Sequence, residues 1–480
     1  MTQTDRITLI KNTSYVVAYD GTQHVLVKNG MVAFKGNEII YAGKNYEGAC
    51  DTVIDAHDGL VTPGFVNVHS HIYGSPVEKG FLEDRANPLF YMSGLYDYLQ
   101  IRALPPEEQP KLFRFALAEM VKKGATTVFD MGIASEEMID IVSKSGVRAY
   151  MAPASVCASW STKNGHEVIY TWDEKRAYDR LEYAVRTFEK YDGTADGRLK
   201  IALYPGQVDT CTPEFFKEIR KTADKTGMRI QVHAAQAIVE YQKIVERHGK
   251  TPAAFLDSCG ITGPDVLYGH YIFPSGHSIN ALQLEGELEL IARTKTNISH
   301  CPWVFVRRGL IMESMDKYLK MGINMGIGTD TTPQDTLAEL KWAAICSKTH
   351  EKHAEKGTAA QVFNMATLGG AKALGRDDIG RLSKGAKADI LIIDTNNVEM
   401  RPLRDPIKAL VYCGQSANIN KVFVDGNLLV DGNKVVGVDE EALGMEIQRA
   451  AEGMYSRVKD KDWAGRTHEE LSPMSFPVVE

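Results

Sequence analysis

The sequence predicts an α/β protein: a (β/α)8 TIM barrel with a small β-sandwich domain composed of both chain termini. From Gly64 to about residue 380, apolar strand-like runs alternate with helical segments, as in βα units around a parallel sheet. Both ends of the chain show short strands separated by turns instead. No Gly-x-Gly-x-x-Gly follows the first strand of the alternating part, which disfavours a dinucleotide-binding sheet.

These changes of pattern divide the chain into three ranges. We expect residues 1–62 to form the first part of the β-sandwich domain and residues 63–380 to form the barrel. Residues 381–480 then complete the sandwich and add a polar terminal helix at 440–459 and an irregular tail. The simplest arrangement is one β domain built from both ends, with the barrel inserted between them.

The individual elements follow from the apolar patterning. Eight barrel strands are expected at 65–68, 126–130, 148–152, 199–204, 229–232, 266–268, 297–299 and 324–328. Helical segments between them are expected at 111–123, 135–143, 175–190, 213–226, 237–248 and 282–294. In the terminal domain, the Asn29-Gly30 turn between apolar runs at 25–27 and 31–34 indicates a hairpin.

Composition excludes several classes of protein. The chain has 480 residues, of which 44% are hydrophobic and 24% charged, as in ordinary globular proteins. Its formal charge of −7 and the lack of long basic runs argue against a nucleic-acid partner. No apolar run is long enough to cross a membrane, and the first residues do not resemble a signal peptide. The 7 cysteines are scattered, so we expect reduced thiols and a cytoplasmic location.

Histidines gather at the carboxyl ends of the expected barrel strands, where barrel enzymes carry their catalytic groups. His69 and His71 end the first strand and, separated by one residue, project to the same side. The later strands end at His233, His270, His300 and Asp330. Each histidine alone is more often structural, but chance placement explains the group poorly. Together they predict a metal site.

The motifs around these histidines resemble the amidohydrolase superfamily, and most closely its triazine hydrolase and nucleobase or S-adenosylhomocysteine deaminase branch. The resemblance covers essentially the whole chain. It is carried by Pro-Gly-Phe-Val-Asn-x-His-x-His at 63–71, His233, Tyr-Gly-His at 268–270, Ser-His-Cys-Pro at 299–302, Gly-Ile-Gly-Thr-Asp at 326–330 and Gly-Ala-Lys-Ala-Asp-Ile at 385–390.

The resemblance implies one divalent metal ion, most often Zn²⁺, with Fe²⁺, Mn²⁺ or Co²⁺ as alternatives. Its ligands would be His69, His71, His233 and Asp330. The expected fourth strand carries no lysine near its carboxyl end, which favours a mononuclear site. A bound Zn²⁺ lowers the pKa of its water to about 7.

The resemblance also implies roles for residues around the ion. Asp330 would act as the general base, and His270 would orient the attacking group or stabilise developing charge. His300 corresponds to a substrate-side histidine of some relatives, although a structural role is equally expected. Members of this branch often form homodimers or larger homo-oligomers, and the same is expected here.

One position departs from the deaminase pattern. These enzymes carry His-x-x-Glu at the fifth strand, whereas this chain has His233-Ala234-Ala235-Gln236. A neutral amide can hydrogen-bond but cannot shuttle a proton. Glu240, one helical turn further on, could substitute, although an exposed helical glutamate is the more common case. Tyr73, in the aromatic segment 73–96, and Trp303 could line an apolar substrate pocket, or they could simply pack beneath a lid.

The sequence therefore leaves three functions to compare. The first is a metal-dependent amidohydrolase that cleaves a non-peptide C–N bond, favouring a urea-, amide- or carbamate-type bond of an apolar or aromatic small molecule. The alternative is an aminohydrolase (deaminase) of an N-heterocycle such as a purine, pterin or triazine. The third is a catalytically inactive scaffold homologue, which has no physical need for the four ligand positions.

Overall fold

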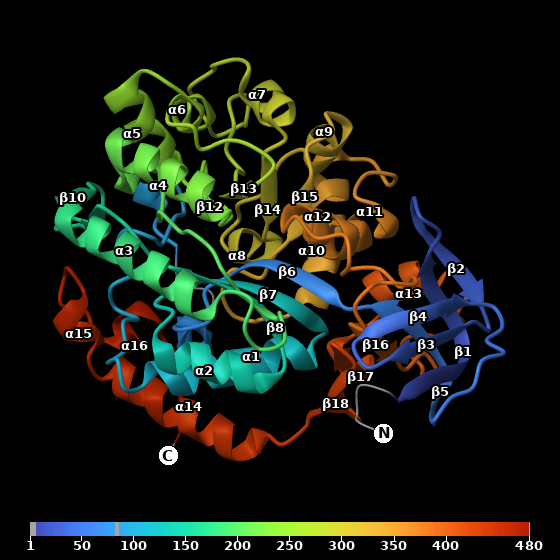
Figure 1. Cartoon of the computed structure of the whole chain (residues 1–480). Coiled ribbons are helices and arrows are strands. Elements are labelled where there is room, and N and C mark those ends of the chain that lie inside the picture. The colour runs from blue at the N-terminus through green and yellow to red at the C-terminus, as the bar shows by residue number, and fades with distance from the viewer. Residues whose placement is uncertain (1–5, 82–85, 480) are drawn as a thin grey trace.

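The computed structural model describes residues 6–81 and 86–479. Residues 1–5 and 480, at the ends of the expected sandwich domain, and residues 82–85 of the aromatic segment lie outside the described residues. Figure 1 shows strands surrounded by helices in the larger part of the molecule, and a strand-rich part at one side. That side holds both the first strands of the chain, in blue, and late strands in orange.

Eight parallel strands form two four-stranded sheets in the helix-rich part. Strands β11 and β12 are joined by a parallel bridge between Leu203 and Ile230, and β6 meets the end of β15 through a bridge between Ser70 and Asp330. The eight expected strands are all present, with ends that differ by at most three residues. The first sheet contains β6 (Phe65–Ser70), β7 (Ala125–Gly132), β8 (Arg148–Pro153) and β11 (Leu199–Ile201), and the second contains β12 (Ile230–Ala234), β13 (Val266–His270), β14 (Asn297–His300) and β15 (Met325–Ile327).

Helices follow each of these strands and bury them. Every residue of β7 and β12 is buried, including polar ones such as Asp130, Gln231 and His233. The principal helices are α1 (Gln109–Lys122), α2 (Glu136–Ser145), α3 (Glu174–Tyr191), α4 (Pro213–Thr226), α5 (Ile238–His248), α6 (Pro252–Ser258), α7 (Glu287–Thr294), α8 (Pro302–Val306), α9 (Met315–Lys320), α10 (Thr336–Glu351), α11 (Ala359–Asn364) and α12 (Gly370–Ala373). The expected helix at 282–294 begins only at Glu287, because Gly286 is left-handed, with φ of 87°.

Short elements fill the connections. The turns η2 (Ser75–Phe81) and η3 (Pro88–Phe90) follow β6, and η4 (Val208–Thr210) follows β11. Between β8 and α3, the sequence analysis assigned no element. The structure has a two-stranded antiparallel hairpin there, β9 (Ala158–Ser161) and β10 (Ile169–Trp172). Ala158, Ser159 and Trp160 of this hairpin line a large cavity.

Both chain ends share one nine-stranded sheet. Its central pairing joins the late β16 to the early β5, which also pairs with β1. An apolar cluster that includes Ile10, Val32 and Ile392 forms its core. The strands are β1 (Ile7–Tyr19), β2 (His24–Lys28), β3 (Met31–Lys35), β4 (Glu38–Gly43), β5 (Thr52–Pro63), β16 (Ile390–Ile393), β17 (Ile419–Val424), β18 (Asn427–Asp431) and β19 (Lys434–Val435).

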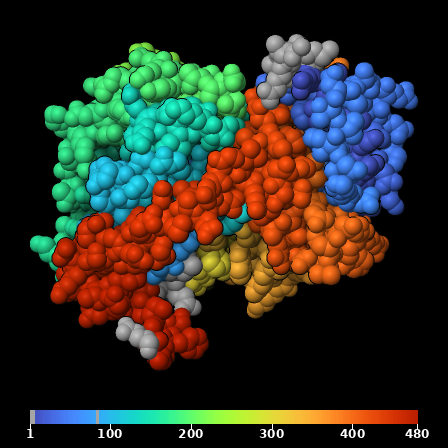
Figure 2. Space-filling model, turned by 90° about the horizontal axis from the view of Figure 1, so that it is seen from below, coloured from blue at the N-terminus to red at the C-terminus, as the bar shows by residue number. Residues whose placement is uncertain are grey.

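The carboxyl-terminal segment crosses the helix-rich part. Helix α14 (Glu440–Tyr455) contacts α1 and η2, and Figure 2 shows the late segment, in red, lying across that face. The expected helix at 440–459 thus ends earlier and is followed by the short α15 (Val458–Lys461) and α16 (His468–Leu471). Helix α13 (Pro406–Tyr412), the π-helical turn η5 (Met365–Gly369) and η6 (Ser416–Asn418) complete the described elements. All seven cysteines are free thiols. Within the described ranges, no helix is long and apolar enough to span a bilayer.

Candidate metal centre and substrate cavity

Three strand ends bring the four predicted ligand residues together. His69 and His71 lie at the end of β6, and His233 lies at the end of β12. Asp330 lies three residues after β15, and its backbone N–H donates to the carbonyl of His69 while its carbonyl accepts from His71. The first and last strands therefore hold their side chains against each other.

Hydrogen bonds made by the Nδ1 atoms orient the imidazoles of His69, His71 and His233. When each Nδ1 donates, the neutral ring presents the lone pair of Nε2, which is the arrangement a metal ligand needs. The acceptors are Gln231 Oε1 for His69 (2.6 Å), the Met131 carbonyl for His71 (2.8 Å) and the Gly206 carbonyl for His233 (3.2 Å).

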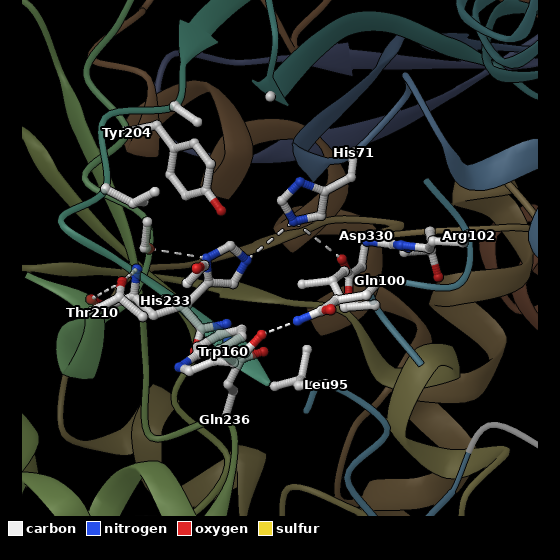
Figure 3. Close-up of a pocket in the computed structure, with 18 of the residues that line it drawn as sticks. His71, Leu95, Gln100, Arg102, Trp160, Tyr204, Thr210, His233, Gln236 and Asp330 are labelled. Atoms are coloured by element: carbon white, nitrogen blue, oxygen red, sulfur yellow. Dashed lines mark hydrogen bonds and ion pairs between the residues drawn. The ribbon is translucent and has the colours of Figure 1, made fainter. Parts of the chain in front are cut away.

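The Nε2 atoms and the carboxylate converge on one point, as Figure 3 shows for His71, His233 and Asp330. The Nε2 atoms of His71 and His233 are 3.1 Å apart. Asp330 Oδ1 lies 3.5 Å from His71 Nε2 and 3.7 Å from His69 Nε2. These spacings suit nitrogen and oxygen ligands that share one ion at about 2.0–2.2 Å.

The buried nitrogens also fit a metal. His69 Nε2 is buried and makes no hydrogen bond to any described residue, which is costly unless something else satisfies it. Both ring nitrogens of His270 are in the same condition, and His270 Nε2 lies 3.8 Å from Asp330 Oδ2. Two sets of three residues can each gather their ligand atoms within 4.8 Å: His69, His233 and His270, and His69, His71 and Asp330.

Electrostatics keep the imidazoles of His71, His233 and His270 neutral and the Asp330 carboxylate ionised. Burial lowers the pKa of His71 to about 4, and burial together with the field of His69 holds the pKa of His233 and His270 well below the ordinary value. Burial of Asp330 opposes its ionisation, but its interactions with His69, His270 and His71 outweigh burial, so its pKa lies well below the usual range. Neutral imidazole and ionised carboxylate are the forms that bind a cation.

The backbone at the site is tightly constrained. His270 and Asp330 have left-handed backbones, with φ of 73° and 57°, which is uncommon for residues with side chains. Gly269 and Gly328 allow His69 to approach: an added Cβ would lie 2.8 Å from His69 Cε1 and 2.5 Å from His69 Cβ, respectively.

A cavity of about 710 Å³ opens above these residues. Tyr73 and Gln236, both predicted to contact substrate, line it together with His71, His233 and Asp330. Asp330 is the only acidic residue among the described lining residues. The lining also includes Leu95, Leu99, Gln100, Arg102, Trp160, Arg176, Arg180, Tyr204, Gln207, Arg307 and Arg308.

Glu240 is buried, contrary to the expectation that an exposed glutamate was the more common case. It is 0% exposed, and its two carboxylate oxygens accept from the backbone N–H groups of Ala235 (2.6 Å) and Gln236 (3.2 Å). Burial and the charge of Asp209 raise its pKa well above the ordinary value. Glu240 thus holds the turn that presents Gln236, and it is not among the described residues that line the cavity.

His300 and Trp303 do not line the main cavity as far as the structure describes it. His300 is buried beside Phe305 and Met312, and burial lowers its pKa to about 4. The Trp303 ring packs against Trp342, at 5.3 Å between centroids. Sequence reasoning missed Trp160 and Gln207 at the cavity. The hairpin that carries Trp160 has no periodic signal. Tyr204 was also missed, although its position at the end of the expected strand at 199–204 was a signal that could have found it.

Three imidazoles and a carboxylate at the carboxyl ends of parallel strands define this as the candidate active site of a metal-dependent hydrolase. The chain belongs to the amidohydrolase family, whose profile matches residues 60–429. It is accordingly a hydrolase that acts on carbon–nitrogen bonds other than peptide bonds.

The individual relatives belong to the deaminases and triazine hydrolases that the sequence motifs resemble. The 5'-deoxyadenosine deaminase of Methanosarcina barkeri is 30% identical over 460 residues, which are 94% of this chain and 99% of the relative. An adenosine deaminase from Xanthomonas campestris, solved with bound zinc, has a TM-score of 0.77 at 22% identity and covers 93% of this chain and 98% of its own. A triazine hydrolase from Arthrobacter aurescens also has a TM-score of 0.77 at 22% identity, covering 93% and 100%.

Proposed function

We propose that this chain is a mononuclear metal-dependent aminohydrolase that removes an amino group from an N-heterocycle, with a purine nucleoside such as 5'-deoxyadenosine as the first candidate. The observation that carries the proposal is the convergence of His69, His71, His233 and Asp330 at the floor of a large cavity. The deaminase relative that matches nearly the whole chain supports the substrate class. The sequence alone favoured a urea-, amide- or carbamate-type bond, and the relatives favour the alternative instead.

The proposed cofactor is one divalent ion, Zn²⁺ first, held by His69, His71, His233 and Asp330. Bound there, it would supply Lewis-acid activation of water. Asp330 would accept a proton and deliver it to the departing nitrogen. His270, which is wholly buried with its Nε2 3.8 Å from Asp330 Oδ2, would orient the attacking group by a hydrogen bond.

Gln236 has a defined place in this proposal. It follows His233 by three residues, lines the cavity, and its buried Nε2 has no hydrogen-bond partner among the described residues. Its amide would donate to a substrate ring nitrogen or carbonyl without transferring a proton. Substrates whose ring nitrogen needs no full protonation should therefore react fastest.

A second candidate is hydrolysis of a urea-, amide- or carbamate-type bond, which the neutral Gln236 favours because such bonds require no ring protonation. A catalytically inactive scaffold is a poorer explanation. A scaffold gains nothing from the uncompensated burial of His69 Nε2 and of both His270 nitrogens.

The proposal extends to architecture and assembly. We take the two parallel sheets, joined by bridges at both edges, as the halves of a (β/α)8 barrel over residues 63–380. We take residues 1–62 and 381–480 as one β-sandwich domain with its terminal helices. A homodimer or larger homo-oligomer and a cytoplasmic location stay predictions.

The test is product analysis on the metal-loaded enzyme. The protein is incubated in separate reactions with 5'-deoxyadenosine, an aminotriazine and phenylurea. Ammonia is measured in the two heterocycle reactions and aniline in the phenylurea reaction, because phenylurea hydrolysis also yields ammonia, and the metal content per chain is determined. We expect about one ion per chain and ammonia from at least one aminoheterocycle. Aniline from phenylurea with no ammonia from the heterocycles would transfer the assignment to the second candidate. Far less than one ion per chain would favour the scaffold.

A further inference from the structure

The hairpin β9–β10 places one aromatic residue, Trp160, on the wall of the substrate cavity. Trp160 is only 8% exposed and lines the cavity together with His71 and His233. Figure 3 shows its ring beside Gln236, Gln100 and Leu95, with His71 and Tyr204 on the opposite side of the view. The indole of Trp160 therefore lines the same cavity as the candidate metal ligands His71, His233 and Asp330.

Asp209 fixes the orientation of this indole. The Trp160 Nε1–H donates to Asp209 Oδ2 (3.3 Å), and the hydroxyl of Tyr170, on the other strand of the hairpin, donates to the same oxygen (2.6 Å). Asp209 is 1% exposed, so these bonds form away from water, where they are strong. The amide of Gln100 donates to the Trp160 carbonyl from the other side.

The surroundings brace the hairpin further. The Arg247 guanidinium lies 4.1 Å from the Tyr170 ring centroid, and it donates to the Asp209 carbonyl at 2.7 Å. Tyr96 packs edge-on against Trp160, with centroids 5.3 Å apart and planes at 76°. The indole plane is thus set before any ligand enters, which removes the ordering cost of binding.

We propose that Trp160, held in place by Asp209, is a preorganised stacking wall that selects flat heteroaromatic substrates over saturated ones. Trp160 is a substrate-contacting specificity residue, and Asp209 is a positioning residue that acts through it. Ring stacking on an indole depends on planarity and not on a particular hydrogen-bond pattern. The proposal rests on the proposed function, because it names the substrate class of the same site, but it predicts binding and not turnover.

The experiment compares two ureas, phenylurea, whose ring is planar and aromatic, and cyclohexylurea, whose six-membered ring is puckered and saturated. Their dissociation constants are measured by calorimetry on metal-loaded protein, while released ammonia and aniline are assayed in the same samples. The wild type should prefer phenylurea. In Trp160→Leu, the ratio of the two dissociation constants should fall by roughly tenfold, whereas Trp160→Phe should keep most of the wild-type ratio. Trp172→Leu is the matched control, because Trp172 lies on the same hairpin but is 44% exposed, and it should retain the full preference.

The ratio of the dissociation constants of cyclohexylurea and phenylurea also tests the role of Asp209. Asp209→Asn keeps an acceptor oxygen and should preserve the preference, whereas Asp209→Leu should reduce it and change the near-UV circular dichroism of the protein. The metal content should stay at the wild-type value in every variant. An unchanged preference in Trp160→Leu, or a wild type that binds both ureas equally, would overturn the proposal. If the separate product analysis found no ammonia from 5'-deoxyadenosine or the aminotriazine, that result would count against the proposed function alone.

Discussion

Asp330 joins more of the candidate site than any other single residue. Its carboxylate lies within 4 Å of His69, His71 and His270, and its backbone is bonded to the strand that carries two of them. No other described residue lining the cavity is acidic. In the proposed reaction, Asp330 would therefore be the carboxylate that takes the proton from water.

Replacing Asp330 tests this role. Asp330→Asn keeps the size of the side chain but removes the base, and the loss of general acid–base catalysis should lower kcat by at least about a hundredfold. The rate is measured on protein reloaded with metal, with the thermal midpoint as a check on folding. His300→Gln is the control at a neighbouring strand end, and it should keep KM within about threefold because His300 does not line the cavity among the described residues. Equal activity of Asp330→Asn and wild type would rule out the role.

Gln236 supplies a second test on a single residue. Gln236→Glu introduces the acid that deaminases of this branch carry, in a position that is 6% exposed. Burial should raise the pKa of the new carboxyl, so that it can protonate a ring nitrogen near neutral pH. We expect a roughly tenfold or larger rise in kcat on poorly activated aminoheterocycles, with a new limb in the pH profile of kcat/KM. An unchanged profile would show that ring protonation does not limit the wild-type reaction.

At the scale of elements, the sequence predicted the parallel strands well and the loops poorly. The strand ends follow from runs of buried apolar residues, and the histidines at those ends could be found from their positions alone. The burial of Glu240 could not be predicted from the sequence. It depends on a turn with a left-handed Ala235 that brings two backbone N–H groups to the Glu240 carboxylate. The Trp160 hairpin depends on contacts with Asp209 from a distant loop. The single sheet shared by both ends depends on the pairing of β5 with β16.

The glycine at the end of β13 tests how closely strands must approach. Gly269→Ala would place a Cβ 2.8 Å from His69 Cε1 and 3.2 Å from His233 Cδ2, so at least one of these imidazoles must move. We expect a loss of about 1–3 kcal/mol in the free energy of unfolding and a weaker metal affinity by about tenfold or more. Gly444→Ala in α14 is the control, since its Cβ meets nothing within 4 Å and alanine favours a helix. Metal affinity equal to that of wild type in Gly269→Ala would contradict the close approach.

At the scale of the whole molecule, polar contacts join the terminal sheet to the helix-rich part. His24 begins β2, and its Nε2 lies 3.1 Å from the hydroxyl of Thr367 in η5. Its ring also packs edge-on against Phe363, with centroids 5.4 Å apart. Burial lowers the pKa of His24 from 6.5 to about 4.

This depressed pKa makes stability depend on pH. The unfolded chain takes up a proton on His24 below pH 6.5, whereas the folded chain does so only near pH 4, so stability falls as the pH falls between these values. Between pH 7 and pH 5 the loss due to His24 should be about 1–2 kcal/mol. His24→Gln should show a loss smaller by that amount in urea unfolding at the two pH values. Identical losses in both proteins would show that His24 is not held neutral.

Arg148 forms the stronger link between the two parts. It lies on β8 with 1% exposure, and its guanidinium donates to Asp389 (3.2 Å) and Asp425 (3.0 Å), which belong to the terminal part. Arg148→Met would leave two buried carboxylates without this partner, at a cost of about 3–5 kcal/mol in the free energy of unfolding. Lys144→Met is the control, because its pair with Asp140 is exposed and should change stability by less than about 1 kcal/mol.

Unfolding in urea, followed by circular dichroism and by metal release, distinguishes a local effect from a global one. If the buried pair couples the two parts, Arg148→Met should lose the terminal sheet at lower urea than the metal centre, so that the two signals separate. In the wild type and in Lys144→Met they should coincide. The metal-bound active site should keep its ligand geometry at low urea, because Arg148 lies among the terminal-sheet carboxylates and is not one of the described residues that line the cavity. A single shared transition at unchanged urea concentration in Arg148→Met would mean that apolar packing alone, and not this ion pair, holds the terminal sheet against the strands that carry the site.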